Sequence, residues 1–319
     1  MGMLVKGVWQ DVGHDMRGGE FVRGESAFRE RVTADGASGF RAESGRYHLY
    51  VSLACPWAHR TLIVRALKGL EDAISVSIVD PFMGPEGWAF GDRRGCTRDS
   101  VNGAAFLREI YLKAMPDYTG RVTVPVLWDK AAGKIVNNES SEIIRMLNRE
   151  FDAFAARRLP DLYPEPLQPQ IDRWNETIYR TVNNGVYRAG FATKQEKYEA
   201  AVRELFGTLN VLEVHLGRHR FLCGPMLTEA DWRLFTTLAR FDAVYYGQFK
   251  CNLRRLVDYP NLWGYTREIY QVPGVAATVN LEQIKEHYYR SLTRINPSGI
   301  VPSGPLLDFD SPHGREVLG

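Results

Sequence analysis

Apolar residues follow two different periods along the chain, and the change falls near residue 160. In the first part, short apolar runs typical of strands are separated by stretches in which apolar residues have helical spacing. The predicted strands cover residues 47–52, 74–79, 124–128 and 134–136, and the predicted helices cover about 58–70, 104–115 and 140–151. In chain order these elements make a βαβαββα unit.

Beyond a proline-rich linker, every long segment has a helical period, which predicts an all-α second domain. The predicted helices cover about residues 167–184, 194–217, 229–246, 260–271 and 280–291. Thr228 to Asp231 has the pattern of an N-terminal capping box, because its end side chains can satisfy main-chain N–H groups there. This box is expected to start a core helix.

The pattern divides the 319 residues into five segments, in line with the usual size of domains. They are an extension (1–46), an α/β domain (47–152), a linker (153–166), an all-helical domain (167–295) and an irregular tail (296–319). The extension is rich in Gly, Arg and Ser and has little periodicity, so we expect it to run over the surface.

Composition and charge narrow the function classes. With 45% hydrophobic and 24% charged residues the chain is typical of a globular protein, and a formal charge of +2 without a basic stripe argues against a nucleic-acid partner. No apolar run reaches the length of a signal peptide or a membrane span. The four cysteines have neither a Cys-x-x-Cys pair nor zinc-site spacing, which favours reduced thiols, no metal and a cytoplasmic location.

Cys55 is the candidate nucleophile. It stands where a predicted strand gives way to a helix, with Pro56 at the first helical position, so main-chain N–H groups and the positive helix end face its sulfur and favour the thiolate. Without this position, a cysteine is most often a small buried apolar residue. Because Ala58 stands where a dithiol oxidoreductase has its second cysteine, a disulfide on Cys55 needs an outside thiol, for which glutathione is the obvious candidate.

Two further positions predict a binding site for an extended peptide. Pro125 precedes a strand, where a cis Val124–Pro125 bond would present the main chain of Val124 for pairing; the alternative is that Pro125 merely begins an edge strand. Residues 138–141 precede an amphipathic helix, so a serine hydroxyl and N–H groups there can hold the α-carboxylate of glutathione, or simply cap the helix.

Several stretches together carry a resemblance to one family. They are YHLYVSLACPWAHR (47–60), GRVTVPVLWD (120–129), TVNNGVY (181–187), LTEAD (227–231), RFDAVY (240–245), His287–Tyr288 and INPSGI (295–300). The chain thereby resembles the glutathione transferase superfamily and, within it, the S-glutathionyl-hydroquinone reductases, also called the Xi class. Departures from the family pattern concentrate in the first 46 residues and in residues 92–96, which leaves the breadth of substrates open.

The resemblance implies a thioredoxin-like N-terminal domain, a helical transferase domain and a homodimer. It also implies that Cys55 attacks the sulfur of a glutathionyl-hydroquinone, that a Cys55–glutathione mixed disulfide forms, and that a second glutathione resolves it. Tyr187 would then be the proton donor and acceptor. Tyr245 and Tyr288 would point their hydroxyls toward Cys55 and the substrate ring, which favours the thiolate. Glutathione contacts implied in the same way are Trp88, Arg121, Val122, Thr123, Val124, Glu139 and Ser140.

Two other functions stay open on the sequence. One is an omega-type activity, in which the same Cys55 removes glutathione from disulfides or reduces dehydroascorbate; the other is a binding module that has kept the fold without catalysis. The physiological hydroquinone is not encoded in any pattern, and Cys96, Cys223, Cys251 and His59 are interpreted as structural.

Overall fold

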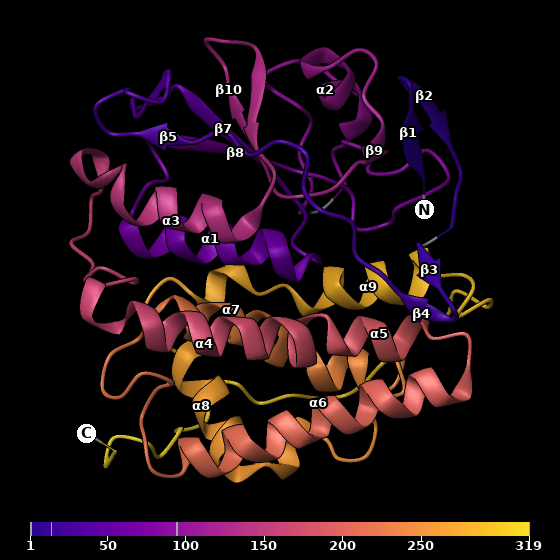
Figure 1. The fold of residues 1–319 in the computed structure, drawn as a ribbon, viewed down its shortest axis with the longest axis vertical. Helices are drawn as coiled ribbons and strands as arrows, with labels where there is room; N and C mark the ends of the chain where they lie inside the picture. Colours follow the sequence, from indigo (N-terminus) through magenta and orange to yellow (C-terminus); the bar gives the residue numbers. More distant parts are fainter. Residues whose placement is uncertain (1, 14, 94, 319) are drawn as a thin grey trace. The chain divides into compact units, whose positions relative to one another are not determined.

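The computed structural model describes residues 2–13, 15–93 and 95–318, and the chain forms two compact units (Figure 1). One unit consists of Met1–His14 and Gly24–Pro160, and the other of Asp15–Arg23 and Asp161–Gly319. We call them the sheet unit and the helical unit. A short piece of the N-terminal extension therefore belongs with the helices.

The sheet unit is built on a four-stranded sheet with the order β11-β10-β7-β8. Its strands are β7 (Tyr47–Val51), β8 (Ile74–Ile78), β10 (Val126–Asp129) and β11 (Lys134–Asn137). Strand β7 is buried along its whole length and pairs parallel with β8 and antiparallel with β10. This mixed sheet, in which β10 and β11 form a hairpin, confirms the predicted thioredoxin-like order.

Three helices complete this unit: α1 (Pro56–Lys68), α2 (Leu107–Ala114) and α3 (Ser140–Arg149). Helices α1 and α3 pack side by side, while α2 lies apart from them and contacts β11 (Figure 1). Helix α1 is capped at its C-terminus by Gly69, whose φ of 62° is in the left-handed region that glycine adopts without strain. At its other end, α1 begins after residues 52–55, which connect it to β7.

The N-terminal extension has more structure than its sequence predicts. It contains β1 (Met3–Val5), β2 (Val8–Gln10), β3 (Met16–Arg17), β4 (Glu20–Phe21), β5 (Val32–Thr33) and β6 (Phe40–Arg41). Strand β1 pairs with both β2 and β9 (Gly120–Arg121), and Leu4 and Val32 are buried. Strands of two or three residues are too short to show an alternating pattern, which is why the sequence indicated only a surface extension.

The helical unit contains six α-helices among the described residues. They are α4 (Gln168–Ile178), α5 (Gly185–Phe191), α6 (Gln195–Leu216), α7 (Glu229–Leu238), α8 (Pro260–Tyr270) and α9 (Leu281–Ser291). The capping box at the start of α7 is present, with the Thr228 N–H donating to Asp231 Oδ2 at 2.8 Å. Asp231 also accepts the hydroxyl of Tyr265, so this carboxylate joins α7 to α8.

Two predicted helices end earlier than expected. The one predicted for 167–184 ends at Ile178 and continues as a π-helical turn, Tyr179–Asn183, before α5, which was not predicted. There Thr181 Oγ1 donates to the Thr177 carbonyl at 2.7 Å, so a side chain competes with the helical ladder. The helix predicted for 229–246 ends at Leu238, and a second π-helical turn, Phe241–Tyr245, follows. Near this break, the Arg240 guanidinium donates a hydrogen bond to the Thr236 carbonyl.

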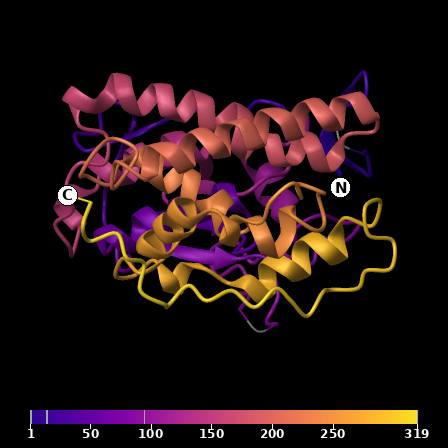
Figure 2. The ribbon, with the colours of Figure 1, turned by 90° about the horizontal axis from the view of Figure 1, so that it is seen from below.

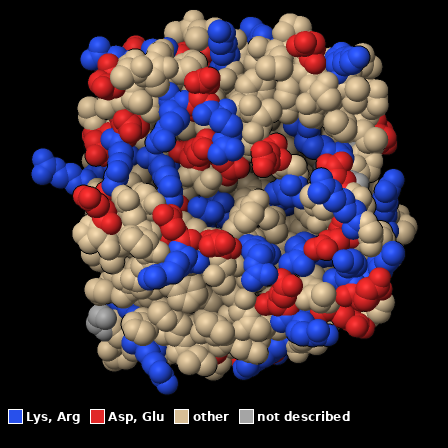
Figure 3. All heavy atoms as spheres, in the orientation of Figure 1, with Lys and Arg blue, Asp and Glu red and all other residues tan. Residues whose placement is uncertain are grey.

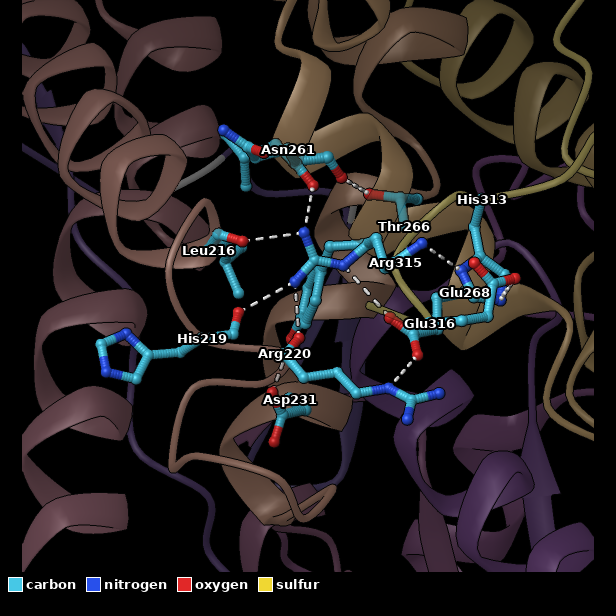
Figure 4. A network of polar contacts seen from close by, with 12 residues as sticks. Leu216, His219, Arg220, Asp231, Asn261, Thr266, Glu268, His313, Arg315 and Glu316 are labelled. Carbon is cyan, nitrogen blue, oxygen red and sulfur yellow. Dashed lines mark hydrogen bonds and ion pairs between the residues drawn. The ribbon is translucent and has the colours of Figure 1, made fainter. Parts of the chain in front are cut away.

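The C-terminal tail is irregular and runs along the helices of its own unit (Figure 2). Phe309 packs against the rings of Trp263 and Tyr270 on α8. Near the end, Arg315 is buried and donates to main-chain carbonyls beyond the end of α6 and to the Glu268 carboxylate (Figure 4). The tail is thus tied to the helices of its unit by the Phe309 ring and by the Arg315 guanidinium.

On the face drawn in Figure 3, basic and acidic side chains are mixed and are separated by uncharged areas. No described helix has the length and apolar character needed to cross a bilayer.

Candidate active site

Cys55 lies at the N-terminus of α1, directly after β7. It is the residue before the first helical turn, its φ of −79° and ψ of 122° are extended, and Pro56 begins the helix. The thiol is partly exposed, and its Sγ lies 3.6 Å from the carbonyl oxygen of Val124. The main-chain N–H groups and the dipole at this helix end favour a negative sulfur, so the position suits a nucleophilic thiolate.

Residues Arg121 to Val124 form the segment beside Cys55. The Val124–Pro125 peptide bond is cis, as predicted. The Tyr111 hydroxyl fixes the segment, since it donates to the Thr123 carbonyl at 2.9 Å and accepts the Thr123 N–H at 3.2 Å. The Arg121 guanidinium donates to the carbonyls of Val12 and Gly13, so the N-terminal extension also holds this segment.

Glu139 and Ser140 lie at the start of α3. The Glu139 carboxylate caps the helix by accepting the Ser141 N–H at 3.0 Å, and it also accepts the Ser26 hydroxyl at 3.1 Å. Although burial opposes ionisation, these hydrogen bonds and the charge of Arg60 hold the pKa of Glu139 below its usual value. Ser140 is buried, and its hydroxyl accepts a hydrogen bond from Arg60 at 3.3 Å.

Trp88 lies in the loop between β8 and α2 and is almost fully buried. Its carbonyl accepts the N–H of Leu107, which anchors the loop to the start of α2. Trp9 of β2 supports the same loop, because its indole N–H donates to the Pro85 carbonyl at 2.9 Å and its ring lies against Gly87. All seven residues expected to contact glutathione thus belong to the sheet unit with Cys55.

The three tyrosines singled out by the resemblance come together in the helical unit. The hydroxyl of Tyr288 lies 2.5 Å from that of Tyr187 and 3.1 Å from that of Tyr245. They come from α9, α5 and the π-helical turn after α7, and Phe249 packs against all three rings. Burial raises the pKa of Tyr245 and of Tyr288 well above the usual value, so both are neutral hydrogen-bonding groups at neutral pH.

Three residues near these groups were not selected from the sequence. Arg60 is buried on α1 with its guanidinium over the Trp57 ring, Ser26 bonds Glu139, and Arg23 bonds Asn184 at 2.8 Å beside Tyr187. Arg60 could have been selected from the sequence, because it is a charged residue on the apolar side of a predicted helix. Ser26 and Arg23 lie in the extension, where no periodicity marks them.

The remaining cysteines differ from Cys55 in their surroundings. Cys223 and Cys251 are buried, and burial raises the pKa of Cys223 to about 11 and raises that of Cys251 further. All four cysteines carry thiols rather than disulfides.

We expect iodoacetamide at pH 7 to modify Cys55 well before Cys223 and Cys251. With a pKa near 11, only about one Cys223 thiol in 10⁴ is ionised at that pH. Peptide mapping by mass spectrometry at increasing times gives the order, and urea-unfolded protein, in which all four thiols are accessible, is the control. Equal rates for Cys55 and Cys223 in the folded protein would contradict this assignment.

Comparisons with known proteins give the family of the chain. The models of the glutathione S-transferase N-terminal and C-terminal domains match residues 54–150 and 195–268. The glutathionyl-hydroquinone reductase YqjG of Escherichia coli is 57% identical over 99% of both chains. The glutathione-bound structure of YqjG has a TM-score of 0.92 at 55% identity, again over 99% of both chains. PcpF of Sphingobium chlorophenolicum, also a glutathionyl-hydroquinone reductase, is 56% identical over 96% of both chains. The structure of a Xi-class transferase from Natrialba magadii has a TM-score of 0.94 at 51% identity and covers 100% of this chain and 97% of that one.

The fold and the two matching domain models define a member of the glutathione transferase superfamily, with a cysteine directly before α1. Within that superfamily, the chain belongs to the glutathionyl-hydroquinone reductases, the Xi class.

Proposed function

We propose that this protein uses glutathione to reduce S-glutathionyl-hydroquinones to hydroquinones, through a mixed disulfide on Cys55. The observation that carries the proposal is the position of Cys55, a partly exposed thiol at a helix N-terminus, with Ala58 rather than a second cysteine one turn further on. Such a site forms a mixed disulfide but cannot resolve it internally. The named activity of the similar YqjG and PcpF supports the choice of substrate.

The reaction proceeds in two balanced steps. The Cys55 thiolate attacks the glutathione sulfur of the substrate, the carbon–sulfur bond breaks, and its electron pair goes to the ring carbon, which takes a proton and leaves as hydroquinone. The thiolate of a second glutathione then attacks the mixed disulfide, releases oxidised glutathione and restores the Cys55 thiolate. The ring carbon is reduced by two electrons, while the thioether sulfur of the substrate and the thiol sulfur of the second glutathione are oxidised to one disulfide.

The proposed glutathione site uses the residues of the sheet unit described above. The main chain of Val124 pairs with the cysteinyl part of glutathione, and the start of α3, with Ser140, binds the α-carboxylate of the γ-glutamyl arm. Glu139 is ionised and therefore suits the neighbouring ammonium group. Trp88, Arg121, Val122 and Thr123 complete the contacts. The glutathione-bound structure of the similar YqjG supports glutathione as the ligand.

The proton for the ring carbon comes from Tyr187 in this proposal, with Tyr245 and Tyr288 in support. Tyr187 has the largest exposed fraction of the three tyrosines, at 9%, against 0% for Tyr245 and 2% for Tyr288. The hydroxyl contact with Tyr288 holds the Tyr187 phenol in one orientation. Tyr288 in turn contacts the Tyr245 hydroxyl, so the three hydroxyls are connected.

We expect Tyr187→Phe to slow release of the hydroquinone by about 10² to 10⁴-fold, the usual contribution of a general acid. Single-turnover kinetics with product chromatography give the rate. Tyr289→Phe is a matched control, since Tyr289 follows Tyr288 on α9 but its hydroxyl donates to the Ala243 carbonyl, at 3.4 Å, instead of joining the tyrosine cluster. Release at the wild-type rate in Tyr187→Phe would remove Tyr187 from the mechanism.

We further propose that the protein acts in the cytoplasm as a homodimer. Thiols in place of disulfides are typical of a reducing compartment, and dimers are usual among glutathione transferases. Light scattering of the eluting protein should give twice the mass of one chain, and a monomer at micromolar concentration would refute the dimer.

The substrate class is tested by comparing two substrates. Purified protein with excess glutathione is expected to reduce glutathionyl-menadiol faster than a glutathionylated disulfide. No turnover of glutathionyl-menadiol alongside reduction of the disulfide would establish an omega-type activity instead, and no turnover of either would leave a binding protein.

A further inference from the structure

The segment Asp15–Arg23 is fixed on the helical unit by its own contacts. The Gly19 carbonyl accepts the Thr193 N–H at 3.0 Å, and the Glu20 carboxylate pairs with Arg188 of α5 at 2.8 Å. Phe21 is buried, with its ring 5.3 Å from that of Phe191 and 6.3 Å from that of Tyr187. Strands β3 and β4 therefore form a small hairpin that packs on α5, the helix that carries Tyr187.

Arg23 follows this hairpin and points to Tyr187. Its Cζ lies 4.9 Å from the centre of the Tyr187 ring, within the range of a cation–π interaction. Its Nε donates to Asn184 Oδ1 at 2.8 Å, three residues before Tyr187. The second contact fixes the guanidinium over the ring, so a partly buried positive charge faces this phenol.

The other charged and titratable groups around Tyr187 differ from Arg23 in their charge or in their partners. Tyr245 and Tyr288 are neutral because burial raises their pKa values, although the charge of Arg240 opposes that effect. The ring of His287 lies against Tyr288, at 5.2 Å. On α5 the charge of Arg188 is offset by Glu20 and Glu204. Arg23, in contrast, places its guanidinium directly over the Tyr187 ring.

We propose that Arg23 is a positioning residue for Tyr187, which holds the ring in place and stabilises the phenolate that forms when Tyr187 gives up its proton. This role rests on the proposed function, in which Tyr187 protonates the departing ring carbon. The negative charge left on Tyr187 spreads into a ring that faces the guanidinium, and it lasts until the proton of the second glutathione thiol restores the phenol. A cation over the ring favours the phenolate more than the neutral phenol.

The test places 3,5-difluorotyrosine at position 187, because ring fluorines lower the pKa of the phenol into the range in which the protein is stable. Fluorine NMR then follows the ionisation of this one residue in the full chain. The backgrounds are wild type, Arg23→Gln, Arg23→Lys and, as matched control, Arg17→Gln, which removes an exposed arginine from the same hairpin.

We expect Arg23→Gln to raise the pH of half-ionisation by roughly 0.5 to 1.5 units, as a partly desolvated cation–π contact implies. Arg23→Lys should give a smaller increase, because it keeps the charge, and Arg17→Gln should leave the value unchanged. With the native tyrosine, Arg23→Gln should lower kcat more than it raises KM. The inference is overturned by an unchanged half-ionisation pH in Arg23→Gln, or by an equal shift in Arg17→Gln.

The titration needs no substrate, so the proposed function and the inference about Arg23 can fail separately. Absence of turnover by the wild-type protein would refute the proposed function, while the titration would still decide whether Arg23 stabilises the phenolate. A shift in the titration without any change in kcat would refute the catalytic part of the inference.

Discussion

Replacing Cys55 by serine is expected to lower turnover of glutathionyl-hydroquinones by at least about a thousandfold, the scale seen when an enzyme loses its nucleophile. A serine hydroxyl is not ionised at neutral pH, even at a helix N-terminus, and its oxygen cannot form a mixed disulfide. The fold should survive, because the Cys55 side chain makes no capping hydrogen bond to α1 and is only partly buried. Steady-state assays with excess glutathione, alongside circular dichroism, measure both properties.

Cys96→Ser is the matched control for this substitution. Cys96 is also partly exposed, but it lies in the loop between β8 and α2 and has no role in the proposed mechanism. Its variant should turn over at the wild-type rate. Substantial activity in Cys55→Ser would mean that another group attacks the substrate.

Arg315→Met is expected to give the largest loss of stability. The guanidinium is buried in the helical unit and meets the carbonyls of Leu216, His219 and Arg220 at 2.8, 3.0 and 2.6 Å (Figure 4). Its Nε also pairs with Glu268 at 3.1 Å, and both side chains are about 95% buried. Methionine fills a similar volume but leaves the carbonyls without a donor and a buried carboxylate with one partner fewer.

The free energy of unfolding of the helical unit should fall by about 3 kcal/mol, near the lower end of the range for breaking a buried ion pair, since Arg220 still contacts Glu268. Urea denaturation followed by circular dichroism and by tryptophan fluorescence measures the change. Arg220→Met is the control, because it removes the other partner of Glu268, whose side chain is 34% exposed, and should cost less than about 1 kcal/mol. Equal losses of stability in the two variants would contradict the larger contribution expected from the buried Arg315.

The period of apolar residues was sufficient to predict the elements that bury one continuous face. Strand β7 and helices α1 and α6 fall within a few residues of their predicted bounds, because each has a long apolar side. The breaks at Ile178 and Leu238 depend instead on single polar groups, Thr181 and Arg240, that bond to nearby carbonyls. The short strands of the extension depend on partners far away in the sequence, such as β9 for β1, and no local pattern records such pairing.

The candidate site shows the same division. Cys55 was found from local chemistry alone, since strand, proline and helix start are all visible around it. The tyrosines were selected only by resemblance, because nothing in the spacing of residues 187, 245 and 288 indicates that their hydroxyls meet. Arg23 could not be found in either way, since its contact with Tyr187 joins residues 164 positions apart through a hairpin of two-residue strands.

The most direct test of the Cys55 mechanism is a single turnover without added glutathione. Fully reduced protein is mixed with a limiting amount of glutathionyl-menadiol, and the intact protein, its peptides and the small molecules are analysed by mass spectrometry and chromatography. We predict one menadiol released for each chain that gains one glutathionyl group, with that group on Cys55 and removable by a second glutathione as oxidised glutathione. Release of menadiol without a glutathionylated Cys55, or a glutathionyl group on another cysteine, would contradict the mechanism.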